Sequence, residues 1–303
     1  MNRSAQDQRV KIALDETRLL ILGAQILFGF HLNSAFQTGF SELSPFSRGL
    51  HAASFLTMAI AIALLITPSL QHQLVDGGRA TARILSASTG FAAAALLPIA
   101  LSLGADLYIV IGHRLGVTTG AAVGIGFALT AIGGWYGAEW FLRRPSPRRG
   151  PVDEPQTPID VRVEHMLTEL RVMLPGAQAL LGFQLAVMLT DAFVALPGAS
   201  KIVHVVALCC ISLAVILLMA PASFHRISFN GQNTEDFYRL GSALVIAAAL
   251  PLGCGIVGDL YVAVTKALDR SDIGVAVAVA AFLILAALWL VHPLLLRARR
   301  MAR

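Results

Sequence analysis

Charged residues and cysteines are scarce in this chain of 303 residues. Only 14% of the residues are charged, whereas soluble domains average roughly 25%, and 56% are hydrophobic. The three cysteines, Cys209, Cys210 and Cys254, lie in apolar stretches, so neither a disulfide framework nor a thiolate metal site is indicated. The low charge excludes an ordinary soluble domain and predicts a polytopic membrane protein.

The sequence also lacks the short motifs that mark common enzymes. It has no Walker loop, no HExxH zinc helix, no GxSxG elbow and no dinucleotide fingerprint in a suitable strand context. The formal net charge is +5, but the basic residues fall in clusters between apolar runs without interleaved aromatic residues. The N-terminal segment lacks the apolar run and cleavage site of a signal peptide. We expect a protein that is not an enzyme, holds no metal, binds no nucleic acid and inserts through its first membrane helix.

One apolar frame occurs twice and organises the chain. Residues 51–72, HAASFLTMAIAIALLITPSLQH, return at 204–225 as HVVALCCISLAVILLMAPASFH, since 204 − 51 and 225 − 72 are both 153. As a helix this frame is roughly 31 Å long, about the thickness of the hydrocarbon layer of a bilayer. Four apolar runs fill the first half, at about 19–38, 50–67, 84–112 and 117–142, and the same offset gives four more.

The repeat predicts an all-α membrane protein of eight transmembrane helices. The expected units are a first four-helix repeat over 1–149, a cytoplasmic linker over 150–168 and a second repeat over 169–303. With the N-terminus inside, 18 of the 23 lysines and arginines lie on the inner side, which predicts that both termini are cytoplasmic. Because each repeat crosses the membrane an even number of times, the repeats run parallel, and we expect a pseudo-twofold axis along the membrane normal.

A carboxylate near the outer end of the third helix is kept in both repeats. Asp106 with Tyr108 returns as Asp259 with Tyr261. A carboxylate at such depth is costly to bury and usually faces a partner or a water-filled cavity. One interpretation is a pair of sites, formed by these four residues, that bind a proton or a monovalent cation for transport. The alternative is that each aspartate reaches interfacial water or forms a fixed structural bond, with partners among His51, His204, Arg48 and Lys201.

Histidines bracket the second helix of each repeat. His51 and His204 lie near its outer end, and His72 and His225 near its inner end. Histidines related by a twofold axis could ligate one haem at each face through paired imidazoles. The alternative is that each histidine binds interfacial water, and His72 also suits the negative C-terminal end of its helix.

Other polar residues return at the same offset. Glu16 and Arg18, which return as Glu169 and Arg171, lie near the inner face, where we expect a polar cluster with His72 and His225. Gln25 and Gln178 lie deeper and are expected to make interhelical hydrogen bonds. They belong to a GAQ-LFGF pattern, whose glycines at 23, 29, 176 and 182 are expected to allow close helix packing. His31 becomes Gln184, and therefore carries less weight as part of a shared site.

The succession of ExR, GAQ-LFGF, an outer-loop phenylalanine, PxxxH and an aspartate resembles a family of short bacterial four-helix membrane proteins of unassigned function. Some members carry automatic labels as sodium:proton antiporters. The matching residues are Glu16, Arg18, Gln25, Phe40, Pro68, His72 and Asp106, and again Glu169, Arg171, Gln178, Phe193, Pro221, His225 and Asp259. The resemblance implies a tandem duplication in a bacterial inner membrane. His51 and His204 depart from a commoner tyrosine, which weakens the outer haem interpretation.

These observations predict an integral membrane protein for ion or proton-coupled transport, with Asp106 and Asp259 as the carriers. Its partners would be the lipid bilayer and a proton or monovalent cation. Two alternatives stay open at this point. The histidines favour a b-type haem redox protein, and the lack of a central charged pathway favours a scaffold or regulatory module that transports nothing.

Overall fold

The computed structural model describes residues 3–79, 81–137, 157–227 and 232–301, and every regular element in these ranges is a helix. The first half contains α1 (Arg3–Ser34), η1 (Thr38–Glu42), α2 (Pro45–Leu74), α3 (Ala82–Leu115), α4 (Val117–Ile132) and the π-helical turn η2 (Gly133–Gly137). The second contains α6 (Ile159–Met188), α7 (Asp191–Val194), α8 (Gly198–Ile227), α9 (Glu235–Leu268), α10 (Ser271–Ala286), the π-helical turn η3 (Ala287–Val291) and α11 (His292–Met301). Because α6 begins at Ile159, its first turns fall within the predicted linker of 150–168.

Seven spans within the described residues are long and apolar enough to cross a membrane. The eighth predicted span, over 19–38, corresponds to the apolar part of α1, Leu20–Ser34, which is shorter than the other seven. This range begins at Leu20 because the side chains before it, apart from Thr17, lie outside the described residues, whereas the helix α1 itself runs from Arg3 to Ser34. The chain is therefore a helical multi-pass membrane protein, but the exact number of eight crossings is not confirmed.

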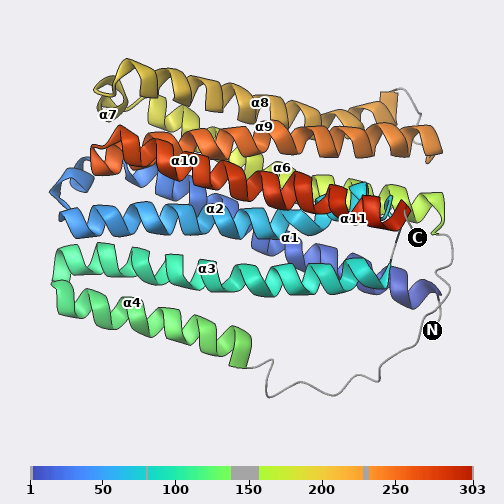
Figure 1. The fold of residues 1–303 in the computed structure, drawn as a ribbon, viewed down its shortest axis with the longest axis horizontal. Helices are drawn as coiled ribbons and strands as arrows, with labels where there is room; N and C mark the ends of the chain where they lie inside the picture. The colour runs from blue at the N-terminus through green and yellow to red at the C-terminus, as the bar shows by residue number, and fades with distance from the viewer. Residues whose placement is uncertain (1–2, 80, 138–156, 228–231, 302–303) are drawn as a thin grey trace.

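The internal repeat is visible in the helices themselves. The helices α8 and α9 begin and end 153 residues after α2 and α3, since 198 − 45, 227 − 74, 235 − 82 and 268 − 115 all give this number. Thr81 and Thr234 cap α3 and α9 in the same way, because each hydroxyl accepts a hydrogen bond from the backbone N–H three residues later. Both ends of the chain lie at one end of the bundle, and η1 and α7 lie at the other, so the halves run parallel (Figure 1).

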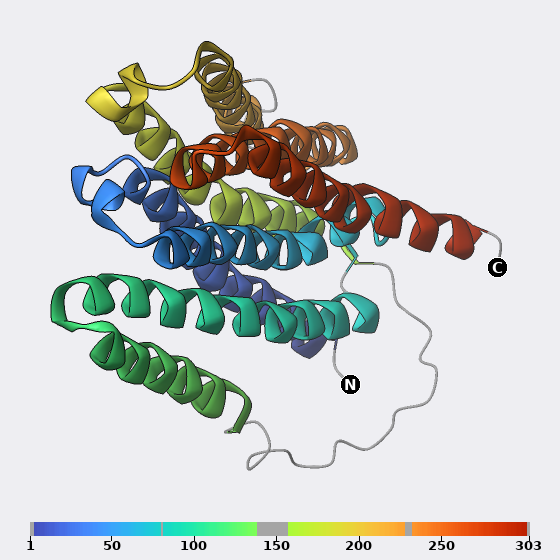
Figure 2. The same cartoon turned by 60° about the vertical axis from the view of Figure 1, so that its left-hand side comes forward.

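The packing between the two halves is not symmetric. The N-terminal helices of the repeats, α1 and α6, pack along each other, and α2 packs against α9 and α10. The reciprocal pairs, α8 with α3 and α8 with α4, make at most marginal contact within the described residues. Figure 2 shows α4 on the far side of α3 from the second half. The predicted pseudo-twofold axis is therefore not confirmed.

Candidate functional site

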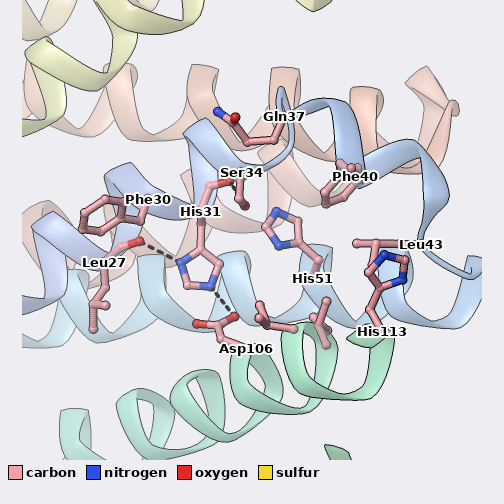
Figure 3. Close-up of a pocket in the computed structure, with 13 residues that line it drawn as sticks. Leu27, Phe30, His31, Ser34, Gln37, Phe40, Leu43, His51, Asp106 and His113 are labelled. Atoms are coloured by element: carbon pink, nitrogen blue, oxygen red, sulfur yellow. Dashed lines mark hydrogen bonds and ion pairs between the residues drawn. The ribbon is translucent and has the colours of Figure 1, made fainter. Parts of the chain in front are cut away.

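A cavity of about 360 Å³ opens between α1, α2, α3 and η1, near the end of the bundle that carries η1 (Figure 3). Most of its wall is apolar, and four titratable side chains interrupt it. The apolar lining includes Leu27, Phe30, Phe40, Leu43, Ile109 and Val110, and the titratable lining is His31, His51, Asp106 and His113. The side chain of Asp106 is 30% exposed, so its carboxylate is accessible from the cavity.

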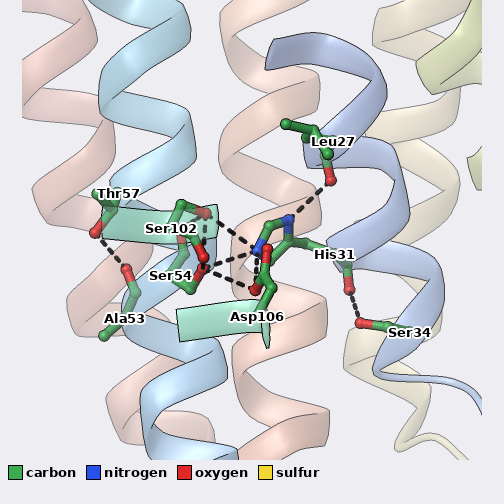
Figure 4. Close-up of polar contacts among 8 residues, drawn as sticks. All are labelled: Leu27, His31, Ser34, Ala53, Ser54, Thr57, Ser102 and Asp106. Atoms are coloured by element: carbon green, nitrogen blue, oxygen red, sulfur yellow. Dashed lines mark hydrogen bonds and ion pairs between the residues drawn. The ribbon is translucent and has the colours of Figure 1, made fainter. Parts of the chain in front are cut away.

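Three helices bring partners to the carboxylate of Asp106 (Figure 4). From α1, His31 Nε2 lies 3.0 Å from Asp106 Oδ1. From α2, the Ser54 hydroxyl lies 3.1 Å from the same oxygen and 2.9 Å from His31 Nε2. Ser102, one turn before Asp106 on α3, lies 2.7 Å from the Ser54 hydroxyl. The carboxylate therefore belongs to a polar network within the first repeat.

The contacts of His31 indicate where its protons are. Its Nδ1 lies 2.8 Å from the backbone carbonyl of Leu27, which only accepts, so Nδ1 carries a hydrogen and donates it. The other nitrogen, Nε2, faces Asp106 Oδ1, and two lone pairs at this distance would repel each other. A proton between Nε2 and Oδ1 removes this repulsion, whether it is bound to the imidazole or to the carboxyl group. His31 and Asp106 thus form a histidine–carboxylate pair at hydrogen-bonding distance.

His51 adds an unpaired nitrogen to the wall of the cavity. Its ring is buried, with 5% exposure, and its centroid lies 5.4 Å from that of His31. Phe40 of η1 packs edge-on against the ring at 5.0 Å. Among the described residues, Nε2 of His51 has no hydrogen-bond partner. A buried polar atom without a partner is costly, and this nitrogen is shielded from the cavity by the atoms around it.

The equivalent aspartate of the second repeat, Asp259, is closed to solvent. Asp259 is fully buried, and Gln184 donates from Nε2 to both of its carboxylate oxygens at 3.0 and 2.9 Å. His204 donates from Nε2 to the backbone carbonyl of Gln184 at 3.1 Å. The other ring nitrogen of His204, Nδ1, lies 3.8 Å from Asp259 Oδ1. Ser54 and Ser102 are replaced by Ala207 and Gly255. Each aspartate therefore contacts partners in its own repeat, and only Asp106 lines one of the cavities described here.

The two tyrosines of the predicted site are not hydrogen-bonded to the aspartates within the described residues. Tyr108 packs edge-on against Phe46, with ring centroids 6.0 Å apart, and Tyr261 packs against the hydrophobic core. Residues two apart on a helix point to different faces, which explains why each tyrosine points away from the aspartate it follows.

The predicted inner cluster is divided between two places. His72 of α2 and Glu169 of α6 are both fully buried and lie 2.5 Å apart, so this pair joins the repeats. Gln73 donates to the second oxygen of Glu169, and its own carbonyl accepts from Tyr238 and Ser242 of α9.

The remaining members of that cluster lie elsewhere. Arg171 and His225 line a separate cavity, where His225 Nε2 lies 3.2 Å from Asn233 Oδ1. Glu16 and Arg18 belong to α1, but their side chains lie outside the described residues. The structure thus brings together His72 and Glu169 but separates them from His225.

The two glutamines differ in environment. Gln25 is buried against Gly176 of α6, and neither atom of its amide has a hydrogen-bond partner among the described residues. Gln178 is exposed on the surface of α6. The expected interhelical hydrogen bonds are therefore not present in the described part of the chain, because the asymmetric packing of α1 on α6 places the two amides differently.

The bracketing histidines have separate neighbours. His51 lies beside His31, His204 beside Gln184, His72 beside Glu169 and His225 beside Asn233. Neither pair of equivalent histidines meets in these contacts. Across the described residues, no group of three or more His, Cys, Asp or Glu side chains is arranged to hold a metal ion.

Sequence reasoning singled out Asp106, gave little weight to its neighbour His31, and missed its neighbours Ser54 and Ser102. His31, Ser54 and Ser102 complete the network, and none of them is kept in the second repeat. One signal was available for His31. This position is polar in both repeats, as histidine and as Gln184, within otherwise apolar helices.

The fold and the site define a multi-pass helical membrane protein built from a tandem repeat, with an open polar site in one repeat. The chain belongs to the Family of unknown function (DUF6328), whose model matches residues 2–139 and again residues 153–293. The two matches confirm the duplication, and the family's description assigns no activity. No curated protein and no solved structure matches the chain.

Proposed function

We propose that this protein carries out proton-coupled cation transport through the site in its first repeat. Asp106 is the carrier, and His31 is the residue with which it shares a proton. The proposal rests on one observation, the His31–Asp106 contact of 3.0 Å at the wall of an accessible cavity. A carboxylate that can exchange its proton with solvent, in a helix long enough to cross the membrane, is a typical proton-relay element.

Access to this site is provided at the end of the bundle that carries η1. A second cavity, of about 410 Å³, shares Gln37 and Phe40 with the first, and is lined by the charged residues Arg48, Asp191 and Lys266. From the distribution of lysine and arginine, we propose that this end faces outward and that both termini are cytoplasmic in a bacterial inner membrane. The second cavity would then be the aqueous entrance.

Only one of the two equivalent aspartates, Asp106, acts in this proposal. Asp259 has no exposed surface, and both of its oxygens accept hydrogen bonds from Gln184. A charge or a substrate cannot reach it without a rearrangement of α6, α8 and α9. We therefore assign Asp259 to the packing of the second repeat, and we invoke neither an enzymatic step nor a cofactor.

The test is proton flux in liposomes that contain the purified protein, an internal pH-sensitive dye and an imposed pH gradient, with different cations outside. We expect the flux in wild-type protein to fall to the level of protein-free liposomes in Asp106→Asn. It should stay within about twofold of wild type in Asp259→Asn. Asp272→Asn is the matched control, because this carboxylate is exposed and pairs with Arg270 at the surface.

Two results would contradict the proposal. Unchanged flux in Asp106→Asn would remove the carrier role of this residue. An equal loss in Asp106→Asn and Asp259→Asn would show that the two repeats act together, against the assignment to the first repeat alone.

A further inference from the structure

The cavity at Asp106 is much larger than a proton requires. Its volume of about 360 Å³ falls within the range of small-molecule pockets, roughly 300–1,000 Å³, which are mostly apolar with a few polar groups that fix orientation. We propose that the substrate exchanged for the proton is an organic monocation with an aromatic or aliphatic body. This inference rests on the proposed function and specifies the substrate class of the same site.

The donor atoms around Asp106 do not suit an inorganic cation. Hard metal cations are held by several oxygen ligands. Here the nearest neighbours of the carboxylate are the imidazole of His31 and the hydroxyl of Ser54, and both already contact Oδ1. The hydroxyl of Ser102 is hydrogen-bonded to the hydroxyl of Ser54. Ser34 and Gln37 also line the cavity, but its wall is mostly apolar and carries one carboxylate, which can balance a single positive charge.

The wall offers an organic cation suitable contacts. Phe30 of α1 and Phe40 of η1 both line the cavity, and aromatic rings attract cations through their faces. Phe30 and Val110 are also 54% and 64% exposed on the apolar surface of the bundle, so the cavity borders the lipid. A cation with an apolar body, which concentrates at the membrane interface, could reach it from there.

Charge balance links the cation to the proton. Besides Asp106, the titratable groups that face the cavity are His31 on α1, His51 on α2 and His113 on α3, and Glu42 of η1 lies 3.6 Å from His113. A bound monocation requires an ionised Asp106, with His31 neutral, so the proton shared by this pair leaves to water. When the cation departs, one proton returns. The net charge of the site is the same in both states, which makes the exchange one proton for one cation.

The first experiment measures binding to the purified full-length protein in detergent by calorimetry. The probe is benzyltrimethylammonium, and its control is neopentylbenzene, the uncharged molecule in which carbon replaces the nitrogen. We expect the cation to bind, with an affinity that falls at lower pH, and to bind at least tenfold more weakly to Asp106→Asn than to Asp272→Asn. Equal binding of the cation and its neutral analogue, or equal affinity in both variants, would overturn the inference.

A second measurement needs no variant, and therefore does not depend on the folding of Asp106→Asn. In weakly buffered solution, benzyltrimethylammonium added to wild-type protein should release one proton for each cation bound. Binding without proton release would overturn the exchange.

Flux in liposomes separates the inference from the proposed function. Proton flux that depends on Asp106 and responds to benzyltrimethylammonium supports both. Flux that depends on Asp106 and responds to sodium or potassium but not to the organic cation overturns the substrate class and leaves the proposed function standing. The absence of any flux dependent on Asp106 overturns both.

Discussion

The two repeats differ in the side chain that contacts the aspartate. In the first repeat His31 reaches Asp106, whereas in the second Gln184 reaches Asp259. An imidazole can hold a proton and pass it on, while an amide has no titratable proton in this range. The same helical frame therefore places a titratable side chain beside the aspartate in one copy and an amide hydrogen-bond donor in the other.

Replacement of His31 by the residue of the second repeat should separate proton exchange from folding. We expect His31→Gln to reduce proton flux at least tenfold, because glutamine cannot share a proton with Asp106. Folding should be preserved, since Gln184 shows that an amide fits beside an aspartate at this position. Flux in liposomes and elution as a monodisperse protein are the two measurements.

His225→Gln is the control for this experiment, because this histidine lies in a different cavity and contacts Asn233. It should leave the flux unchanged. If His31→Gln is as active as His225→Gln, the shared proton has no part in transport.

At the scale of residues, the comparison of repeats found the aspartates but ranked their neighbours poorly. Asp106 stood out because a carboxylate is rare and costly in a membrane helix. His31, Ser54 and Ser102 did not, because they change between the copies, and serines are frequent in membrane helices. Which of these side chains meet depends on the rotation of α1, α2 and α3 about their axes, which a single sequence does not specify.

At the scale of elements, the sequence predicted most of the helices well. Length, apolar composition and the offset of 153 residues determine where α2, α3, α8 and α9 lie, and the caps at Thr81 and Thr234 follow the same offset. The contact between α1 and α6 was not predicted, because the sequence pattern indicates no partner helix for either of them. The glycines of the GAQ-LFGF pattern were expected to allow close packing, but only some of them do so.

Gly29 and its equivalent Gly182 form a matched pair for this contact. A Cβ at Gly29 would lie 2.1 Å from Cδ2 of Phe183 on α6, whereas a Cβ at Gly182 would meet nothing within 4 Å. We expect Gly29→Ala to destabilise the protein by about 1–3 kcal/mol through overpacking. Gly182→Ala should be neutral or slightly stabilising, because alanine favours helix more than glycine does. Unfolding by SDS in mixed micelles measures both variants.

Equal stability of the two variants would contradict the asymmetric contact. In a twofold arrangement Gly182 would face Phe30 as Gly29 faces Phe183, and both substitutions would then be harmful. The comparison therefore tests the packing of α1 on α6 directly.

At the scale of the whole molecule, equivalent residues make different connections. Tyr136 in η2 donates a hydrogen bond to the carbonyl of Ala93 within its own repeat. Its equivalent Trp289 in η3 donates at 2.9 Å to the carbonyl of Ala63 in the other repeat. The repeat predicted a symmetric pair because similar sequences favour similar interfaces. Within the described residues, α10 and η3 pack on α2 of the other repeat, whereas α4 and η2 pack mainly within their own repeat.

The buried pair of His72 and Glu169 is a polar connection between the repeats. Both side chains are fully buried, and the two oxygens of Glu169 accept from His72 and from Gln73. Glu169→Gln keeps the size of the side chain but places an amide N–H₂ against one of these donors. We expect a loss of about 2–4 kcal/mol in the free energy of unfolding, because a buried group then has no partner.

The measurement is again SDS-induced unfolding in mixed micelles, followed through tryptophan fluorescence. The matched control is Glu235→Gln, since Glu235 is 46% exposed and pairs with Arg162 and Arg239 at the surface. Surface ion pairs contribute about 0–1 kcal/mol, so this control should unfold close to wild type. An equal free energy of unfolding in Glu169→Gln and Glu235→Gln would contradict this expectation. In that case the apolar contacts of α1, α2, α6 and α9 hold the two repeats together, and the buried pair does not stabilise the protein further.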